Sequence, residues 1–140
     1  MMATFENMSL GDNSGYNSMD KVQKIIDGLG TVKGVKKVLL VTEEGFPILS
    51  ARTLPISDDV ETIVSAMVAG IVSTFSSACI QLNLGDQVDF IHVQTPIGLG
   101  IISKVQSTIL VLITDSNVKL GLMHYLVSST KMKLIKIREF

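Results

Sequence analysis

The sequence predicts an α/β domain in three layers, with a five-stranded antiparallel sheet between helices. Two uninterrupted apolar runs, at 38–41 and 109–113, are typical of strands that are buried on both faces. Glycine, proline and polar residues at tight turns separate the remaining strand-like stretches. Apolar residues recur at helical spacing in three other segments. The predicted order is therefore helix, two strands, helix, three strands, helix.

The composition fits one domain that has more apolar surface than it can bury alone. The chain has 140 residues, of which 46% are hydrophobic and 18% are charged, against about 25% charged residues in an average protein. Its formal net charge of −1 lacks the basic excess that is typical of nucleic-acid binding. The one cysteine, Cys79, cannot form an internal disulfide, and no signal-like segment opens the chain. We therefore expect a cytoplasmic location.

The first predicted element is a helix over residues 19–30, with Ser18 as its N-cap. Residues 1–17 show no hydrophobic period and predict a flexible tail. We therefore place the folded domain at residues 18–135 and a short basic end at residues 136–140.

The next segment predicts a β-hairpin. Residues 38–41 form its first strand and residues 46–50 its second strand. Glu44 and Gly45 form the turn, because glycine tolerates the positive φ that a tight hairpin requires. Pro47 cannot donate a hydrogen bond to a neighbouring strand, so the second strand is expected at a sheet edge.

Ser57, Asp58 and Asp59 predict the start of a long helix that runs to about Leu82. Residues 62–85 contain no charged side chain, and about 20 apolar residues suffice to span a bilayer. Serine, threonine and amide side chains interrupt this stretch, however, and no basic flank or aromatic belt frames it. We therefore favour a helix that protein buries on most sides over a membrane span.

Three strands and a final helix complete the domain. The strands are expected near 87–94, 99–105 and 108–114, and Asn117 or Ser116 is expected to cap the helix. Polar residues in the first of these strands predict that it lies at the second sheet edge. Because tight turns make consecutive strands neighbours, the spatial order 2-1-5-4-3 satisfies all these expectations.

The long helix has two unlike halves when its residues are placed at 100° intervals. We expect the bulky half, which includes Met67, Val68 and Ile71, to cover the sheet. The opposite half has small side chains and no charge, which favours contact with a second copy of the chain over a solvated surface. The free edge of the third strand is available to extend the sheet across the same twofold axis. The predicted dimer interface consists of Ser65, Ala66, Ala69, Gly70, Ser73, Ser76, Ser77, Ile80, Asp89, Ile91 and Val93.

No residue pattern predicts catalysis, a metal site or a cofactor. His92 and His124 lie on different predicted elements, and Cys79 is expected to face the core, so the spacing of metal ligands is absent. The glycines at 28–34 match neither phosphate-binding motif and predict a connector between a helix and a strand.

Cationic side chains raise two further questions. Arg52 or Arg138 could serve as an arginine finger on a nucleotide-hydrolysing partner, but a surface arginine without a catalytic role is the favoured interpretation. The basic residues between Lys131 and Glu139 are favourable near a helix C-terminus in themselves. Docking of an acidic partner or a membrane surface to them stays open.

Residues 33–48, KGVKKVLLVTEEGFPI, resemble the roadblock family. The family pattern is Lys-Gly-Val, a hydrophobic strand, an acidic or polar pair, glycine, a hydrophobic residue, proline and isoleucine. Residues 115–122, DSNVKLGL, are similar to the Asn-Leu-Gly-Leu start of the final helix in prokaryotic members, although Val118 and Lys119 interrupt that pattern. The resemblance covers about residues 18–135 and implies a roadblock/profilin-like fold.

The resemblance implies a non-enzymatic dimer, built from the long helix and the third strand, that regulates or scaffolds a Ras-like small GTPase. The implied partners are a second copy, or another roadblock chain, and the GTPase; nucleic acid is not implied, and membrane contact is implied only indirectly. Such a dimer acts by reshaping the switch regions of the GTPase, without lending an arginine. Two alternatives stay open: an adaptor of the dynein light-chain type without GTPase contact, and a small-molecule sensor, which few inward polar residues support.

Overall fold

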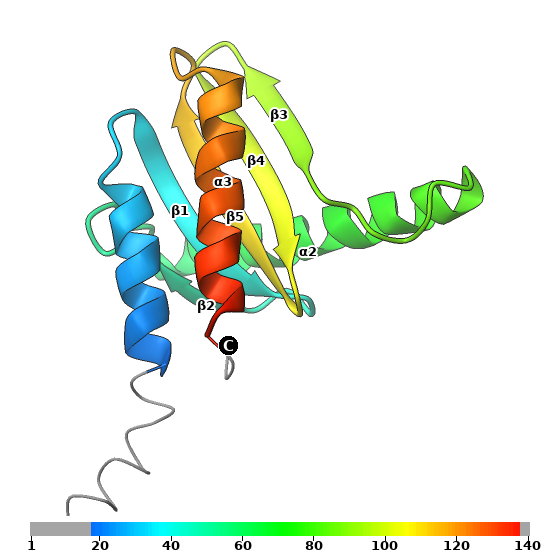
Figure 1. The fold of residues 1–140 in the computed structure, drawn as a ribbon, viewed down its shortest axis with the longest axis horizontal. Coiled ribbons are helices and arrows are strands. Elements are labelled where there is room, and N and C mark those ends of the chain that lie inside the picture. Colours follow the sequence, from blue (N-terminus) through cyan, green and yellow to red (C-terminus); the bar gives the residue numbers. More distant parts are fainter. Residues whose placement is uncertain (1–17, 138–140) are drawn as a thin grey trace, which may run out of the picture.

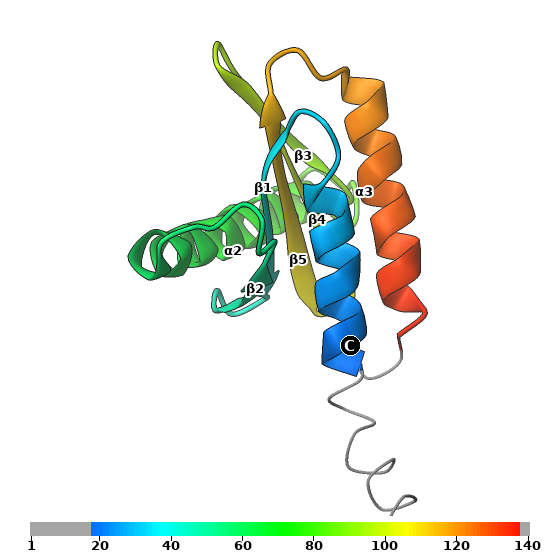
Figure 2. The ribbon, with the colours of Figure 1, turned by 90° about the vertical axis from the view of Figure 1, so that its left-hand side faces the viewer.

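The computed structural model describes residues 18–137, which form three layers. The sheet is the middle layer, and α2 (Asp58–Gln81) crosses one of its faces (Figures 1 and 2). The N-terminal helix (residues 18–30) and α3 (Leu120–Ile135) lie side by side on the other face. The predicted three-layer α/β architecture is confirmed. The predicted tail, residues 1–17, lies outside the described part of the chain, as do the last three residues.

The middle layer is a five-stranded antiparallel sheet in the order β2-β1-β5-β4-β3. This confirms the predicted order 2-1-5-4-3. The two central strands contain the predicted buried runs, because Leu40 and Leu110 are both 0% exposed. The strands are β1 (Val35–Thr42), β2 (Pro47–Ser50), β3 (Ile91–Thr95), β4 (Gly98–Val105) and β5 (Thr108–Asp115).

The two sheet edges are the two that the sequence predicts. β2 begins at Pro47, which lies opposite Val41 of β1. β3 pairs with β4 alone among the described strands. It begins later than the predicted 87–94, because the hydroxyl of Ser103 donates a hydrogen bond of 2.7 Å to the carbonyl oxygen of Asp89. A side chain thus takes the place of the strand-to-strand ladder before β3 starts.

Two hydrophobic clusters fill the spaces between the layers. Towards the N-terminal helix and α3, the cluster includes Ile26, Leu112 and Met123, which are all 0% exposed. The cluster towards α2 is smaller, and α2 is the one described helix on that face of the sheet. The buried members of this smaller cluster are Leu39, Val41, Val68, Ala69, Val72, Ile102, Ile109 and Val111.

The turn between β1 and β2 allows α2 to approach the sheet closely. Gly45 has a φ of 100°, a conformation that glycine adopts without steric cost. A Cβ atom at Gly45 would lie 3.1 Å from the Cα of Ala66 and 3.4 Å from the Cβ of Ala69. The predicted glycine turn is confirmed, and it has a second role as the contact point of α2.

The start of α2 is the one that the sequence predicts, whereas the start of α3 is not. The Ser57 hydroxyl accepts a hydrogen bond of 3.4 Å from the backbone N–H of Val60, and acidic residues occupy the first turn of α2. In α3 the N-cap is Lys119, whose side chain makes no capping bond. Capping by Asn117 or Ser116 is therefore wrong, because these residues belong to a turn that the backbone bond from Val118 to Asp115 closes.

Candidate functional site

The side of α2 that packs on the sheet differs from the predicted one. Its buried residues are Ser65, Val68, Ala69 and Val72. Two of these come from the predicted bulky half and two from the predicted small half, so the boundary between the halves faces the sheet. Burial of Ser65 and Ala69 within their own chain removes both from the predicted dimer interface.

Small side chains on α2 serve the close contact with the chain's own sheet. The backbone of Ala66 and the Cβ of Ala69 lie against Gly45, and a bulkier side chain at Ala69 would push the helix away. The hydroxyl of Ser65, which is 0% exposed, donates a hydrogen bond of 2.6 Å to the carbonyl oxygen of Glu61. The small residues thus fix the rotation of α2 and turn its bulky side chains outwards.

The outward side of α2 forms a stripe of large apolar side chains, which we call the α2 stripe. Its members are Val60, Ile63, Met67, Ile71 and Phe75, which are 49%, 60%, 62%, 38% and 51% exposed. The expectation that the bulky half covers the sheet is therefore wrong for most of its length. Burial of α2 by protein on most sides stays a prediction, because it includes contact with a second chain. By length and composition alone, α2 is also long and apolar enough to cross a membrane.

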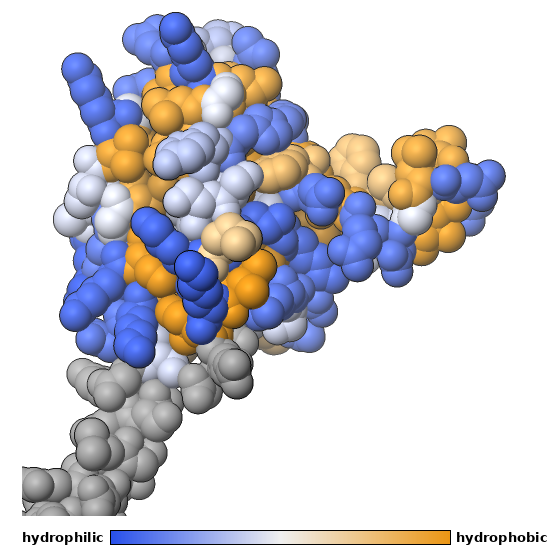
Figure 3. Space-filling view, in the orientation of Figure 1, coloured by the Kyte–Doolittle hydropathy of each residue, from blue (hydrophilic) through white to orange (hydrophobic). Residues whose placement is uncertain are grey.

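The C-terminal part of α2 projects beyond the edge of the sheet formed by β3 (Figure 1). Ile80, Leu82 and Leu84 lie in or just after this overhanging part and are 55%, 68% and 69% exposed. Figure 3 shows hydrophobic side chains at this projecting end. Because apolar surface of this extent is unfavourable in water, the overhang indicates a contact with another molecule.

The sheet face beside α2 carries a complementary apolar groove. The groove has a volume of about 370 Å³ and lies between α2 and the strands β3, β4 and β5, where Val64, Val93 and Ile113 contribute to its walls. A second apolar hollow of about 260 Å³ adjoins it and shares Val64 and Ile113. The single chain thus leaves uncovered both an apolar helix and an apolar part of the sheet.

The remaining predicted interface residues of α2 lie in a different environment. Ser73, Ser77 and Ile80 line a hollow of about 380 Å³ beside α2, together with Ser76. Charged residues complete this hollow, among them Lys104, whose Nζ lies 2.9 Å from the Oε1 of Glu43. Ala66 and Gly70 are exposed. Part of the small half of α2 therefore lines a polar hollow. The sequence did not predict this hollow.

The predicted interface residues near β3 lie along an open sheet edge. Val93 is 47% exposed and faces the apolar groove, while Ile91 packs against the smaller cluster. Asp89 is exposed and precedes the strand. The backbone of β3 is therefore available for pairing with another strand.

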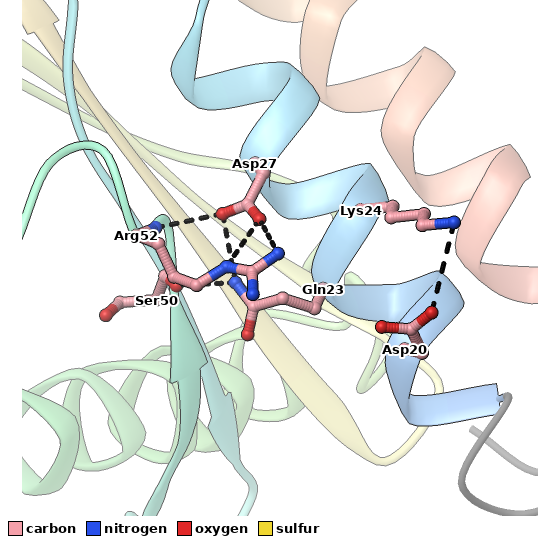
Figure 4. Close-up of polar contacts among 6 residues, drawn as sticks. All are labelled: Asp20, Gln23, Lys24, Asp27, Ser50 and Arg52. Carbon is pink, nitrogen blue, oxygen red and sulfur yellow. Dashed lines mark hydrogen bonds and ion pairs between the residues drawn. The ribbon is translucent and has the colours of Figure 1, made fainter.

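Arg52 is held in an ion pair with Asp27 (Figure 4). Its Nε and Nη2 donate to Oδ2 of Asp27 at 2.9 and 2.7 Å, and its backbone N–H donates to Oδ1 at 2.9 Å. Gln23 adds a bond to the same carboxylate at 3.0 Å and another to the carbonyl oxygen of Ser50 at 2.9 Å. Arg52 thus joins the N-terminal helix to the end of the hairpin, whereas an arginine finger must be free to reach a partner. Arg138 lies outside the described residues.

The ion pair sets the ionisation of Asp27. Partial burial by itself raises the pKa of this carboxyl group. The hydrogen bonds from the Arg52 backbone, the Arg52 side chain and Gln23, together with the positive charge of Arg52, outweigh that effect and hold the pKa of Asp27 below its usual range. The carboxylate is therefore stabilised by the fold.

The two histidines meet, although the sequence places them on different elements. The ring centroids of His92 on β3 and His124 on α3 are 4.5 Å apart, and the ring centroid of Phe90 lies 4.6 Å from that of His124.

Within residues 18–137, no group of three or more His, Cys, Asp or Glu side chains could hold a metal ion. Cys79 is expected to face the core, but it is only half-buried.

A five-stranded sheet of this order, with one helix across one face and two on the other, defines a roadblock/profilin-like α/β sandwich. The Roadblock/LC7 domain profile matches residues 21–114. The chain therefore belongs to the Roadblock/LC7 family, as the resemblance of residues 33–48 implies.

Comparison with solved structures supports the same fold. MglB of Myxococcus xanthus is 24% identical, with a TM-score of 0.75 over 85% of this chain and 95% of that protein. The gliding protein MglB of Thermus thermophilus is 18% identical, with a TM-score of 0.73 over 87% of this chain and 91% of that protein. Profilin IB of Acanthamoeba castellanii is 15% identical, with a TM-score of 0.60 over 81% of this chain and 96% of that protein. A comparison with curated protein sequences gives no match.

Proposed function

We propose that this protein is a non-enzymatic homodimer that regulates or scaffolds a Ras-like small GTPase. Membership of the Roadblock/LC7 family supports a regulatory role. The observation that carries the proposal is the exposed α2 stripe beside an uncovered apolar groove. A catalytic site would instead require convergent polar or titratable groups in a pocket, and most of the side chains that line this groove are apolar, with Lys36 as its one charged residue.

The proposed dimer places the overhang of one α2 over the groove of the other chain. A twofold axis near β3 makes this exchange reciprocal, because each chain has both the overhang and the groove. Pairing of the two β3 edges extends the sheet across the same axis. The interface then includes the α2 stripe and Val93, in place of the predicted contact between the small halves of the helices.

Burial of the α2 stripe offers a free-energy gain comparable with the cost of forming a dimer. Burial of a large apolar side chain contributes about 1.5–3 kcal/mol relative to full exposure, and the five residues of the α2 stripe are already partly covered. Half of that gain at each residue gives about 4–8 kcal/mol per chain. Both chains contribute, so the pair gains about 8–15 kcal/mol, which is comparable with the cost of association, about 4–15 kcal/mol.

The position of Arg52 supports regulation without a donated arginine. Its guanidinium group is bound to Asp27 and lies next to the N-terminal helix, on the side of the sheet away from α2. A GTPase that docks on the α2 side would therefore have to rely on its own catalytic groups, which the dimer holds in place. Such positioning contributes to catalysis without a covalent step.

The test is a titration of candidate small GTPases with the purified homodimer. We expect a change in the rate of GTP hydrolysis or of nucleotide release, and the same effect from a variant in which Arg52 is replaced by Lys. A GTPase that binds without a rate change would indicate scaffolding. Absence of any effect or binding in both nucleotide states would contradict GTPase regulation and favour an adaptor that joins a larger complex.

A further inference from the structure

The helices α2 and α3, on opposite faces of the sheet, carry charges of opposite sign, while the N-terminal helix has two lysines and two aspartates. The first turn of α2 contains Asp58, Asp59 and Glu61, and α2 has no basic residue. The helix α3 contains Lys131 and Lys133 and no acidic residue. Its N-cap and C-cap are both lysines. Because the net charge of the whole chain is only −1, this segregation gives one face of a nearly neutral protein a positive potential.

Large apolar side chains lie between these lysines on the outer side of α3. Leu122, Tyr125 and Met132 are 44%, 67% and 60% exposed, and their spacing places them on one side of the helix. Glycine and serine residues separate them and add little bulk. The exposed side of α3 therefore carries both apolar and cationic groups.

The N-terminal helix continues this surface. It lies beside α3 in both views of the ribbon (Figures 1 and 2). A groove of about 340 Å³ runs between the two helices, with Ile25 and Leu126 contributing apolar groups and Lys24 and Lys133 contributing one ammonium from each helix. The Nζ of Lys24 is 3.9 Å from Asp20, and its side chain is 75% exposed, so this weak ion pair leaves Lys24 available. Figure 3 looks onto this layer and shows hydrophilic side chains directly beside hydrophobic ones.

We propose that the layer formed by the N-terminal helix and α3 binds the surface of an anionic lipid bilayer. Lipid phosphates neutralise Lys24, Lys133 and Lys136, while Tyr125 and Met132 enter the boundary between head groups and acyl chains. Lysine side chains are long enough to keep their ammonium groups at the phosphate level while their stems contact apolar surface. The surface lies on the opposite side of the sheet from α2, so the proposed dimer leaves it free.

The chemistry of the cations favours a bilayer over an acidic protein. Specific recognition of carboxylates typically uses arginine, whose planar guanidinium group binds them through two hydrogen bonds. The N-terminal helix and α3 contain lysine and no arginine, and the guanidinium group of Arg52 beside them is already bound to Asp27. Lysines act as point charges and suit a surface on which the anions are numerous and mobile. Each lysine near such a surface strengthens binding by about fivefold.

The experiment is co-sedimentation of the full chain with vesicles of phosphatidylglycerol and phosphatidylcholine, compared with vesicles of phosphatidylcholine alone. We expect binding to the anionic vesicles that weakens as salt is added. The double substitution Lys133→Glu and Lys136→Glu should weaken binding by at least about 25-fold, since two favourable charges are lost. Tyr125→Ser should weaken the part of the binding that resists salt.

A control adds negative charge on the other side of the sheet. Ser73 and Ser77 are exposed and line the polar hollow beside α2, and replacement of both by Glu should leave vesicle binding within about twofold of the parent, since charges beyond about 10 Å are screened. Circular dichroism and light scattering confirm that each variant keeps its fold and its oligomeric state. Equal binding to both kinds of vesicle, or an equal loss in the control, would overturn the proposal. Binding to polyglutamate without binding to vesicles would assign the surface to an acidic protein and would also overturn it.

Discussion

At the scale of single residues, one ion pair ties the N-terminal helix to the hairpin and one glycine allows α2 to approach the sheet closely. Asp27 and Arg52 are separated by 25 positions in the sequence, and their three hydrogen bonds tie the N-terminal helix to the end of β2. The sequence showed two possible roles for Arg52, and the structure shows a structural role. The partner could not be predicted, because the position of the hairpin end relative to the helix depends on the packing of the whole core.

Replacement of Asp27 by Asn should lower the free energy of unfolding at neutral pH by about 1 kcal/mol. The pKa of Asp27 is lower in the folded chain than in the unfolded chain, so its contribution is full above the unfolded pKa of about 3.9. That contribution is lost as the pH falls through the folded pKa. Urea unfolding should therefore show a difference between the two proteins at pH 7 that shrinks on acidification. Asp20→Asn serves as the control, since its contact with Lys24 is long and exposed; a constant difference at all pH values would contradict this account.

Gly45→Ala should lower the free energy of unfolding by about 2 kcal/mol. The new alanine would have to adopt a φ of 100°, and its Cβ would lie 3.1 Å from the Cα of Ala66. Both backbone strain and crowding of α2 therefore contribute. Gly28→Ala is the matched control, because it lies in a helix with open space around it, and it should raise the free energy of unfolding by about 0.5–1 kcal/mol. Thermal or urea unfolding measures both. Equal effects of the two substitutions would contradict a specific requirement for glycine at position 45.

At the scale of elements, α2 shows what a helical pattern can and cannot predict. Its start at Ser57, its length and its two unlike halves follow from local sequence. Its rotation does not, because hydrophobicity alone assigns the bulky half to the core. Steric fit decides instead: Ser65 and Ala69 lie where the helix approaches the sheet most closely, and Met67 and Phe75 point away. A run of small residues beside a glycine turn was the available signal for this packing.

Met67→Lys should raise the dissociation constant of the dimer by at least tenfold, because burial of an unpaired charge is costly. Ser73→Lys should change it by less than about threefold, since Ser73 lines the polar hollow beside α2 and a long side chain there can reach water. Sedimentation equilibrium of both variants distinguishes a contact through the α2 stripe from the contact between small halves that the sequence predicts. Met132→Lys on α3 is the control for the added charge. The opposite ranking of Met67→Lys and Ser73→Lys would return the interface to the small half.

At the scale of the whole molecule, the strand order followed from few facts. Tight turns, Pro47 at one edge and the polar residues near His92 at the other left one arrangement. The candidate interface was less accessible to sequence analysis. Its groove combines Val64 on α2 with Val93 on β3 and Ile113 on β5, and such a surface exists only after the layers have packed. The overhang of α2 likewise depends on the angle at which it crosses the sheet.

The melting temperature should rise with protein concentration if the single chain is incomplete. Association of folded chains stabilises them by mass action, so a higher concentration shifts unfolding to higher temperature. Calorimetry over about a hundredfold range of concentration measures this effect. Met67→Lys, as an interface variant, should show a smaller dependence. A melting temperature that is independent of concentration in both proteins would contradict obligate pairing.

The overhang of α2 also bears on how the protein survives in a cell. The end of this helix and the residues that follow, up to Leu84, expose large apolar side chains and gain little from their own chain. A newly made chain without a partner therefore exposes apolar surface that proteases and chaperones recognise. For the proposed dimer, we therefore expect unpaired chains to be degraded, so that the amount of active protein depends on the rate at which chains associate.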